Sequence, residues 1–487
     1  MPTEFQTTPL SLAEALGVLA PDMDVPWASE LSASSICIDS RQAEPESLFV
    51  AFAGERVDGH DYVAQAFAAG ATLALIERPL DGVPVVDTAS GAWPEEPSSA
   101  VAIRVPSTLD ALQALAGGRR TARPDLRVIG VTGSIGKTTT KEVIAGVLGQ
   151  RYALLKSRGN YNNEIGLPLT LMTLRPEHRR AVLEMGMYAL GEIADLCALA
   201  RPQVGVVTCV APIHLERLGT IERIAQAKAE LPQALPADGV AVLNADDPRV
   251  AAMAAQTQAQ IVTYGEAPTA DVRAVRVEGL GLEGSVIHVA IAEHALWPGQ
   301  AGAYELRIRL PGKPVVSAAL AAVAVGLVEG LAWSEIEQGL ASQTEGLRLA
   351  VRPGRDGIRL LDDSYNASPP AVLAALDLLQ ELDARRIAVL GDMLELGNGE
   401  AEAHRQVGEW AAARCDLLVT VGPRARGIAA AAMENGMDVD SVHALGTNGE
   451  AIDCLHGLLR PEDVVLIKGS RSMQMEEIVQ ALGAMPS

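Results

Sequence analysis

The chain has 487 residues, 48% of them hydrophobic and 21% charged, and its 39 basic and 61 acidic residues give a net charge of −22. This length exceeds one ordinary hydrophobic core and predicts two to four domains. The negative charge argues against a nucleic-acid partner, because phosphate backbones are bound by clustered Lys and Arg. Short basic pairs such as Arg119-Arg120 are interpreted as solvated helix ends.

The five cysteines lie far apart and include no C-x-x-C pair. This spacing favours reduced thiols in a cytoplasmic protein over a disulfide framework or a zinc site. The first residues lack the basic and apolar regions of a signal peptide. The most apolar run, Ala318 to Val328, is shorter than a membrane span. We therefore expect a cytoplasmic protein that does not insert into membranes.

Residues 1–122 predict a small α/β domain, because strand and helix patterns alternate there. The expected elements are a helix at 10–19, a strand at 47–53, a helix at 62–69, a strand at 71–76 and a proline-marked loop at 84–97. Ser40 and Arg41 form one polar cluster at a strand end, and Asp58 and His60 form another. Such positions bind ligands in many α/β folds, but Asp, Ser and Gly are also ordinary turn formers, so both interpretations stay open.

Residues 123–343 begin with an apolar strand at 128–131, a glycine turn and an amphipathic helix. The turn reads Thr132-Gly133-Ser134-Ile135-Gly136-Lys137-Thr138. Glycines allow a tight turn whose N–H groups, together with the helix dipole, can hold a phosphate. Lys137 would add a charge on the outer phosphates, and Thr138 a hydroxyl for Mg²⁺. The strict phosphate-loop pattern has glycine where this chain has Val131, and the alternative is an ordinary turn with a solvated lysine.

Polar residues follow several apolar segments in this domain. An asparagine-rich loop contains Asn160, Asn162 and Asn163. Glu184, His214 and Asn244 lie at or after the ends of apolar strands, and Lys228 lies on a predicted helix. An acidic group beside a phosphate loop is where a hard cation is held. A lone histidine at a strand end is often structural, and Lys228 can be an ordinary solvated lysine. Polar groups at the same end of at least four strands predict an open, mostly parallel sheet.

The later part of the chain changes pattern twice. Short alternating segments within 261–311 predict an antiparallel insertion at the sheet edge, and helices at 316–329 and 334–340 close the domain. Residues 344–487 predict a Rossmann-like, doubly wound domain without a phosphate loop. Its strands are expected at 357–361, 386–390, 417–421 and 463–467.

Taken together, the motifs resemble those of the Mur ligases of peptidoglycan synthesis. The resemblance rests on the glycine turn, on Gly-Asn-Tyr-Asn-Asn-Glu-Ile-Gly-Leu-Pro, on Leu-Glu-Met-Gly and on the late Lys-Gly-Ser-Arg. Asp362 to Pro369 and Gly391 to Gly397 are similar to the member that joins D-alanyl-D-alanine to a UDP-muramoyl tripeptide. The resemblance implies three domains. Residues 1–122 would bind the UDP substrate, residues 123–343 would bind ATP, and residues 344–487 would close over the site.

The resemblance also implies site residues. ATP would contact Thr132, Gly133, Ser134, Ile135, Gly136, Lys137, Thr138, Asn244, Arg348 and Asp363. Two Mg²⁺ ions would use Thr138, Glu184, His214 and a carbamylated Lys228, with Lys137, His214 and Lys228 catalytic. The substrates would contact Ser40, Arg41, Asp58, His60, Asn160, Asn162, Asn163, Tyr365, Asn366, Lys468, Ser470 and Arg471. The enzyme would act as a monomer on small molecules.

One departure concerns the adenine. The family usually has Gly-x-His-Asn-x-x-Asn before its alanine-rich helix, whereas this chain has Gly312-Lys313-Pro314-Val315-Val316-Ser317-Ala318. Two other ligases fit the sequence less well. The ligase that adds the third amino acid typically has Asp-Tyr-Ala-His-Thr-Pro and Asp-Asn-Pro-Arg motifs, which this sequence lacks. A folylpolyglutamate synthase would not explain the first domain. A nucleotide-driven switch or motor would give no purpose to the Asn-rich and Asp-rich motifs.

Overall fold

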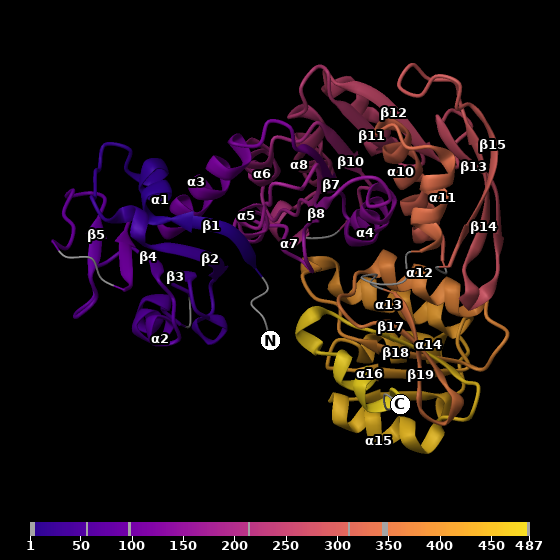
Figure 1. Ribbon diagram of the computed structural model, residues 1–487. Helices are drawn as coiled ribbons and strands as arrows, with labels where there is room; N and C mark the ends of the chain where they lie inside the picture. Colours follow the sequence, from indigo (N-terminus) through magenta and orange to yellow (C-terminus); the bar gives the residue numbers. More distant parts are fainter. Residues whose placement is uncertain are drawn as a thin grey trace. The chain divides into compact units, whose positions relative to one another are not determined.

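The computed structural model describes residues 5–54, 57–95, 99–212, 215–309, 312–342 and 349–484. The chain forms two compact units. The first comprises Met1–Gly130, Tyr152–Met187 and Gly191–Gln203, and the second comprises Val131–Arg151, Tyr188–Leu190 and Val204–Ser487. Three separate sheets, each with its own helices, confirm the predicted α/β class (Figure 1). The predicted domain boundaries after residues 122 and 343 stay predictions.

The N-terminal sheet has six strands in the order β1-β2-β3-β4-β6-β5. Its elements are β1 (Gln6–Ser11), α1 (Leu12–Leu19), β2 (Ser32–Cys37), β3 (Ser47–Val50), α2 (Val63–Ala68), β4 (Leu73–Ile76), β5 (Val85–Asp87), β6 (Val101–Arg104) and α3 (Thr108–Thr121). All its pairs are parallel except β1 with β2. Apolar residues of the strands and of α2, among them Phe49 and Val63, form the core on one face.

Two sequence predictions in this region are wrong in detail. The first helix begins at Leu12 rather than at residue 10, because Ser11 caps it in a reciprocal box with Glu14 and ends a strand that the pattern did not reveal. The proline-marked loop also contains β5, a three-residue edge strand, where prolines flanking a strand are tolerated.

The middle sheet has nine strands in the order β15-β14-β13-β12-β11-β10-β7-β9-β8. They are β7 (Arg127–Thr132), β8 (Leu154–Lys156), β9 (Arg180–Glu184), β10 (Val204–Val207), β11 (Val240–Asn244), β12 (Gln260–Gly265), β13 (Val272–Gly279), β14 (Ser285–Ile291) and β15 (Gly302–Ile308). The helices of this region are α4 (Lys137–Leu148), α5 (Gly166–Met172), α6 (Glu192–Ala200), α7 (Leu215–Leu218), α8 (Ile221–Gln233), α9 (Pro248–Ala251), α10 (Lys313–Val328) and α11 (Trp333–Ala341). Strands β13, β14 and β15 pair antiparallel at one edge, which confirms the predicted insertion.

The C-terminal sheet has six strands in the order β16-β17-β21-β18-β19-β20. Its elements are β16 (Ala350–Pro353), β17 (Arg359–Asp363), α12 (Pro369–Gln380), β18 (Arg386–Gly391), α13 (Glu400–Ala412), β19 (Leu417–Val421), α14 (Arg426–Glu434), β20 (Val442–Leu445), α15 (Asn448–Leu458), β21 (Val464–Lys468) and α16 (Glu476–Leu482). The four predicted strands are present, and the two edge strands, β16 and β20, are additional.

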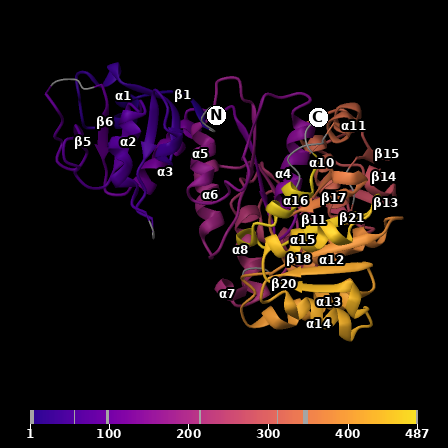
Figure 2. The same cartoon turned by 90° about the horizontal axis from the view of Figure 1, so that it is seen from below.

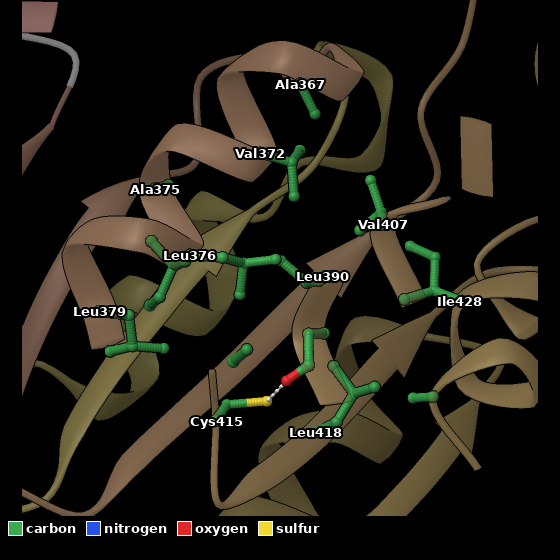
Figure 3. Close-up of a cluster of buried hydrophobic side chains, with 14 of the residues drawn as sticks. Ala367, Val372, Ala375, Leu376, Leu379, Leu390, Val407, Cys415, Leu418 and Ile428 are labelled. Carbon is green, nitrogen blue, oxygen red and sulfur yellow. Dashed lines mark hydrogen bonds between the residues drawn. The ribbon is translucent and has the colours of Figure 1, made fainter. Parts of the chain in front are cut away.

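Alternate residues of this sheet enter two cores. Leu390, Val464 and Leu466 pack with α12, α13 and α14 in the cluster drawn in Figure 3. Val389 and Val465 pack on the other face with α15 and α16. Figures 1 and 2 both show these two helix layers on opposite sides of the strands. Such two-sided burial explains the continuous apolar runs of the strands.

Arg120 corrects the interpretation of the short basic pairs. Its side chain is 4% exposed, and its guanidinium donates to the carbonyls of Ala200, Arg123 and Arg201. It therefore satisfies backbone carbonyls at the ends of α3 and α6 inside the first unit instead of facing solvent. All five cysteines are free thiols. Among the described residues, no helix is long and apolar enough to cross a membrane.

Candidate active site

The glycine turn after β7 has the geometry of an anion-binding loop. Gly136 adopts a left-handed conformation with φ of 84°, and α4 begins at the next residue. No described side chain caps the start of α4. The N–H groups of the first helical turn can therefore bind a phosphate, which the positive end of the helix dipole also favours.

The loop is tied to the turn after β10. Ser134 donates its backbone N–H to the Cys209 carbonyl, and its hydroxyl bonds to both the N–H and the carbonyl of Ala211. Thr208 Oγ1 donates to the Ile135 carbonyl over 2.6 Å. A Cβ on Gly133 would lie 1.8 Å from Thr208 Oγ1, so only glycine fits there. Thr208 is not among the residues predicted from the sequence, although a threonine after an apolar strand is a recognisable signal.

Two lysines of the second unit lie near one another. The Lys137 ammonium donates to the carbonyls of Gly133 and Ser134, at 2.9 and 3.3 Å. Lys228, on α8, is 1% exposed, and no hydrogen bond or ion pair joins its ammonium to a described residue. Burial lowers the pKa of Lys228 well below its usual range, and the charge of Lys137 lowers it further.

The other residues predicted to contact the nucleotide or its metal ions lie in different places. Thr132 is buried and accepts the N–H of Thr208 through its carbonyl, while Thr138 is half-buried in the first turn of α4. Asn244 donates its amide to the Thr208 carbonyl and accepts the N–H of Asp246, so it holds the turn after β11. His214 and Arg348 lie outside the described residues.

In the first unit, Glu184 ends β9 with its side chain fully buried. Asn162 Nδ2 donates to Glu184 Oε1 over 2.8 Å, and Ser157 Oγ accepts the Glu184 N–H over 3.1 Å. Asn163 Oδ1 accepts the N–H of Gly166 at the start of α5, whereas Asn160 is exposed. The structure thus pairs Glu184 with one of the three predicted asparagines.

The polar clusters of the N-terminal sheet are also organised by internal bonds. Arg41 is exposed and forms a bidentate pair with Asp39, and the buried Ser40 bonds to Gln65. His60 Nε2 accepts the Glu77 N–H, so Nδ1 carries the proton and donates to Asp58 Oδ1 over 2.6 Å. Both ring nitrogens of His60 therefore shape the turn.

Asp58 is stabilised as a carboxylate. The bond from the His60 backbone N–H, together with the bonds from the His60 ring and from Arg78, lowers the pKa of Asp58 to about 2. Arg78 also reaches Asp61, so the turn carries an exposed ion-pair network. Its contribution to stability is small at this exposure, since solvent screens such pairs.

The predicted residues of the C-terminal sheet converge. Lys468 Nζ lies 2.5 Å from Asp363 Oδ2 and 3.0 Å from the Asn366 carbonyl, and both charged side chains are buried. The Arg471 guanidinium lies over the Tyr365 ring, 5.4 Å from its centre, and pairs with Glu476. These residues come from two loops at the carboxyl end of neighbouring parallel strands.

Two further side chains hold these loops: Ser470, which is one of the predicted substrate contacts, and His404, which was not predicted from the sequence. Ser470 donates its N–H to the Asp392 carbonyl and accepts the Leu394 N–H at its hydroxyl. His404 is 1% exposed and accepts the Met393 N–H at Nε2 over 3.1 Å. Both act on the Gly391 to Gly397 segment, and its glycine-rich, acidic composition is the signal that could have pointed to His404.

Comparison with known proteins decides the family. Profiles of the Mur ligase middle domain, the Mur ligase glutamate ligase domain and the Mur ligase family catalytic domain match residues 131–326, 347–471 and 32–120. The UDP-N-acetylmuramoyl-tripeptide–D-alanyl-D-alanine ligase of Bacillus subtilis is 36% identical over 452 residues, which cover 92% of each chain. The chain belongs to the Mur ligase family.

Solved Mur ligases share the fold over nearly the whole chain. MurF of Acinetobacter baumannii has a TM-score of 0.82 at 30% identity and covers 98% of this chain and 99% of its own. The MurF ligase of Thermotoga maritima, solved in complex with ADP, has a TM-score of 0.76 at 26% identity and covers 92% and 96%. The resemblance seen in the motifs of this Mur ligase is therefore confirmed.

Proposed function

We propose that this Mur ligase joins D-alanyl-D-alanine to a UDP-N-acetylmuramoyl-tripeptide at the expense of ATP, for peptidoglycan and cell-wall synthesis. The Bacillus subtilis relative carries that name over 92% of both chains. The structural observation that supports it best is the phosphate loop. No described side chain caps its helix, which begins at Lys137, and the loop is hydrogen-bonded to the turn after β10. The ligase that adds the third amino acid, which acts one step earlier, would need a different substrate motif after β17.

The first chemical step makes the acceptor reactive. A carboxylate is a poor acceptor for an amine, because its leaving group would be oxide. The terminal carboxylate oxygen of the tripeptide attacks the γ-phosphorus of ATP, the bond to the β-phosphate oxygen breaks, and ADP leaves. Lys137 and the N–H groups of the loop offset the charge that spreads over the transferred group.

The second step forms the amide. The free amine of D-alanyl-D-alanine attacks the carbonyl carbon of the acyl phosphate, the carbon–oxygen bond to phosphate breaks, and the amine loses a proton. The products are the UDP-linked pentapeptide, ADP and phosphate. Holding three substrates in line is chiefly positioning work, so we propose that the loops carrying Lys468, Ser470 and Arg471 contact the dipeptide, and that Ser40, Arg41 and the Asp58 turn contact the UDP end.

The donor chemistry of the chain fits Mg²⁺. Thr138 offers a hydroxyl, and Glu184 offers a fully buried carboxylate that Asn162 already orients. Hard oxygen donors of this kind are those that Mg²⁺ prefers. Two Mg²⁺ ions held by such donors, with His214 as a further ligand, would neutralise phosphate charge.

Lys228 is proposed to be carbamylated. A charged ammonium that is 1% exposed and joined to no described partner is costly. Capture of CO₂ by the neutral amine forms a nitrogen–carbon bond and releases a proton, and the product is a carboxylate on a long arm. Such a group would be a hard oxygen donor for a cation, which accounts for a lysine at this position.

Two further parts of the proposal concern the whole molecule. We propose that the enzyme is a monomer and that it acts in the cytoplasm, where ATP is available. Light scattering coupled to gel filtration would measure the mass, for which a monomer is 51.0 kDa.

Phosphate release from purified protein and ATP tests the main proposal. Release is expected only when both the UDP-muramoyl tripeptide and D-alanyl-D-alanine are present. Release with ATP alone, or release that a macromolecular partner stimulates without the dipeptide, would instead support a nucleotide-driven switch.

A further inference from the structure

Asn162 orients the Glu184 carboxylate, and the position of the Asn162 side chain depends on residue 186 being a glycine. Asn162 Nδ2 donates to Glu184 Oε1, and the Asn162 amide lies against Gly186. A Cβ on Gly186 would lie 2.9 Å from Asn162 Oδ1, 3.0 Å from its Cγ and 3.2 Å from its Nδ2. The amide can therefore reach Glu184 only because residue 186 has no side chain.

The backbone of Gly186 does not itself require glycine. Its φ lies outside the left-handed region that L residues avoid. The three atoms nearest to the added Cβ all belong to the side chain of Asn162, which can rotate away. An alanine at 186 should thus be accommodated by a rotamer change at Asn162, without a shift of the main chain.

The surrounding bonds would survive that rotation. The Gly186 N–H donates to the Asn162 carbonyl over 2.8 Å, and the Glu184 N–H donates to Ser157 Oγ. These bonds hold the backbone of the asparagine loop and of β9 independently of the Asn162 amide. The bond from Asn162 to the carboxylate is the contact that a Cβ at 186 would remove.

We infer that Gly186 and Asn162 are positioning residues for the cation, acting together through Glu184. The inference rests on the proposed function, in which Glu184 holds Mg²⁺. Asn162 fixes one oxygen and so sets the direction of the carboxylate, and Gly186 leaves the space that Asn162 needs. Partners that orient a metal-binding group in this way typically change metal affinity by about 10–100-fold when removed.

A double-mutant cycle tests the coupling. Gly186→Ala and Asn162→Ala are each expected to weaken binding by about 10-fold. The double variant should be no weaker than Asn162→Ala alone, because the clash disappears with the amide. Affinity for Mn²⁺ is measured by electron paramagnetic resonance on the full-length protein with a non-hydrolysable ATP analogue, and the half-saturating Mg²⁺ is measured in the ligase assay.

Gly17→Ala is the matched control. Gly17 lies within α1, and nothing lies within 4 Å of a Cβ added there, so Mn²⁺ affinity should stay at the wild-type value. Additive losses in the cycle, or wild-type Mn²⁺ affinity in Gly186→Ala, would overturn the inference. If Gly186→Ala does not fold, wild-type affinity in Asn162→Ala overturns it equally.

Failure of the proposed function gives a different result. In that case the wild-type protein itself releases no phosphate with both substrates present, whatever the variants do. A wild type that is active, together with an indistinguishable Gly186→Ala variant, rejects the positioning role alone.

Discussion

Asp363 and Lys468 are direct register partners on the parallel strands β17 and β21, and their side chains form a buried ion pair of 2.5 Å. The pair joins residues 105 positions apart in the chain. It lies at the root of both loops that carry the predicted substrate contacts. The ion pair thus couples the shape of one loop to that of the other.

Removing one partner of this pair should destabilise the protein. Asp363→Ala leaves the Lys468 ammonium buried without its counter-charge, which costs about 3–5 kcal/mol. Urea unfolding measures the loss of free energy of unfolding. The double variant Asp363→Leu with Lys468→Met should recover most of it, since no buried charge remains. Equal destabilisation of the single and double variants would contradict this account.

Lys228 should be needed as an anion rather than as a cation. Lys228→Ala is expected to lower turnover on the order of 100-fold, the scale of losing one electrostatic group, and added short carboxylates should partly restore it. The rate of phosphate release measures both effects. Lys137→Ala is the control, because a carboxylate cannot replace its positive charge. Unchanged turnover in Lys228→Ala would reject the carbamate.

Thr208 should matter through its bond to the phosphate loop. Thr208→Val keeps the shape of the side chain but removes the bond to the Ile135 carbonyl. A bond worth about 0.5–1.5 kcal/mol predicts a rise in KM for ATP of about 2–10-fold.

The control for this change is Thr420→Val. Thr420 Oγ1 is buried and has no hydrogen-bond partner among the described residues, so its removal should not reduce stability or activity. A similar rise in KM for ATP in both variants would show that the effect is not specific to the loop.

The turn at Asp58 predicts a dependence on acidic pH. The folded-state pKa of about 2 lies below the ordinary value of 3.8, so the carboxylate stabilises the fold at pH values above 3.8. That contribution is lost as the pH falls from about 4 towards 2.

Asp58→Asn should therefore be less stable than the wild type near neutral pH, with a difference that shrinks below pH 4. Thermal unfolding at stepped pH values measures it. Asp22→Asn, an exposed aspartate that bonds to no described residue, is the control. A difference that stays constant with pH would contradict the prediction.

The local sequence determined the phosphate loop and most of the elements around it. Gly136 and Lys137 follow an apolar strand and begin an amphipathic helix, and such a pattern is set by residues that are neighbours in the chain. The antiparallel insertion follows in the same way from alternating apolar residues, and the four main strands of the C-terminal sheet follow from continuous apolar runs. The family motifs likewise lie within short segments.

Tertiary structure alone decided how side chains from distant segments meet. No local pattern shows that Asp363 pairs with Lys468, that Arg120 reaches the carbonyl of Ala200, or that Gly186 makes room for Asn162. Each of these depends on strand order and on packing between segments, which periodicity does not encode. Short edge strands such as β5 were missed for the same reason, since hydrogen bonds to a neighbouring strand define them.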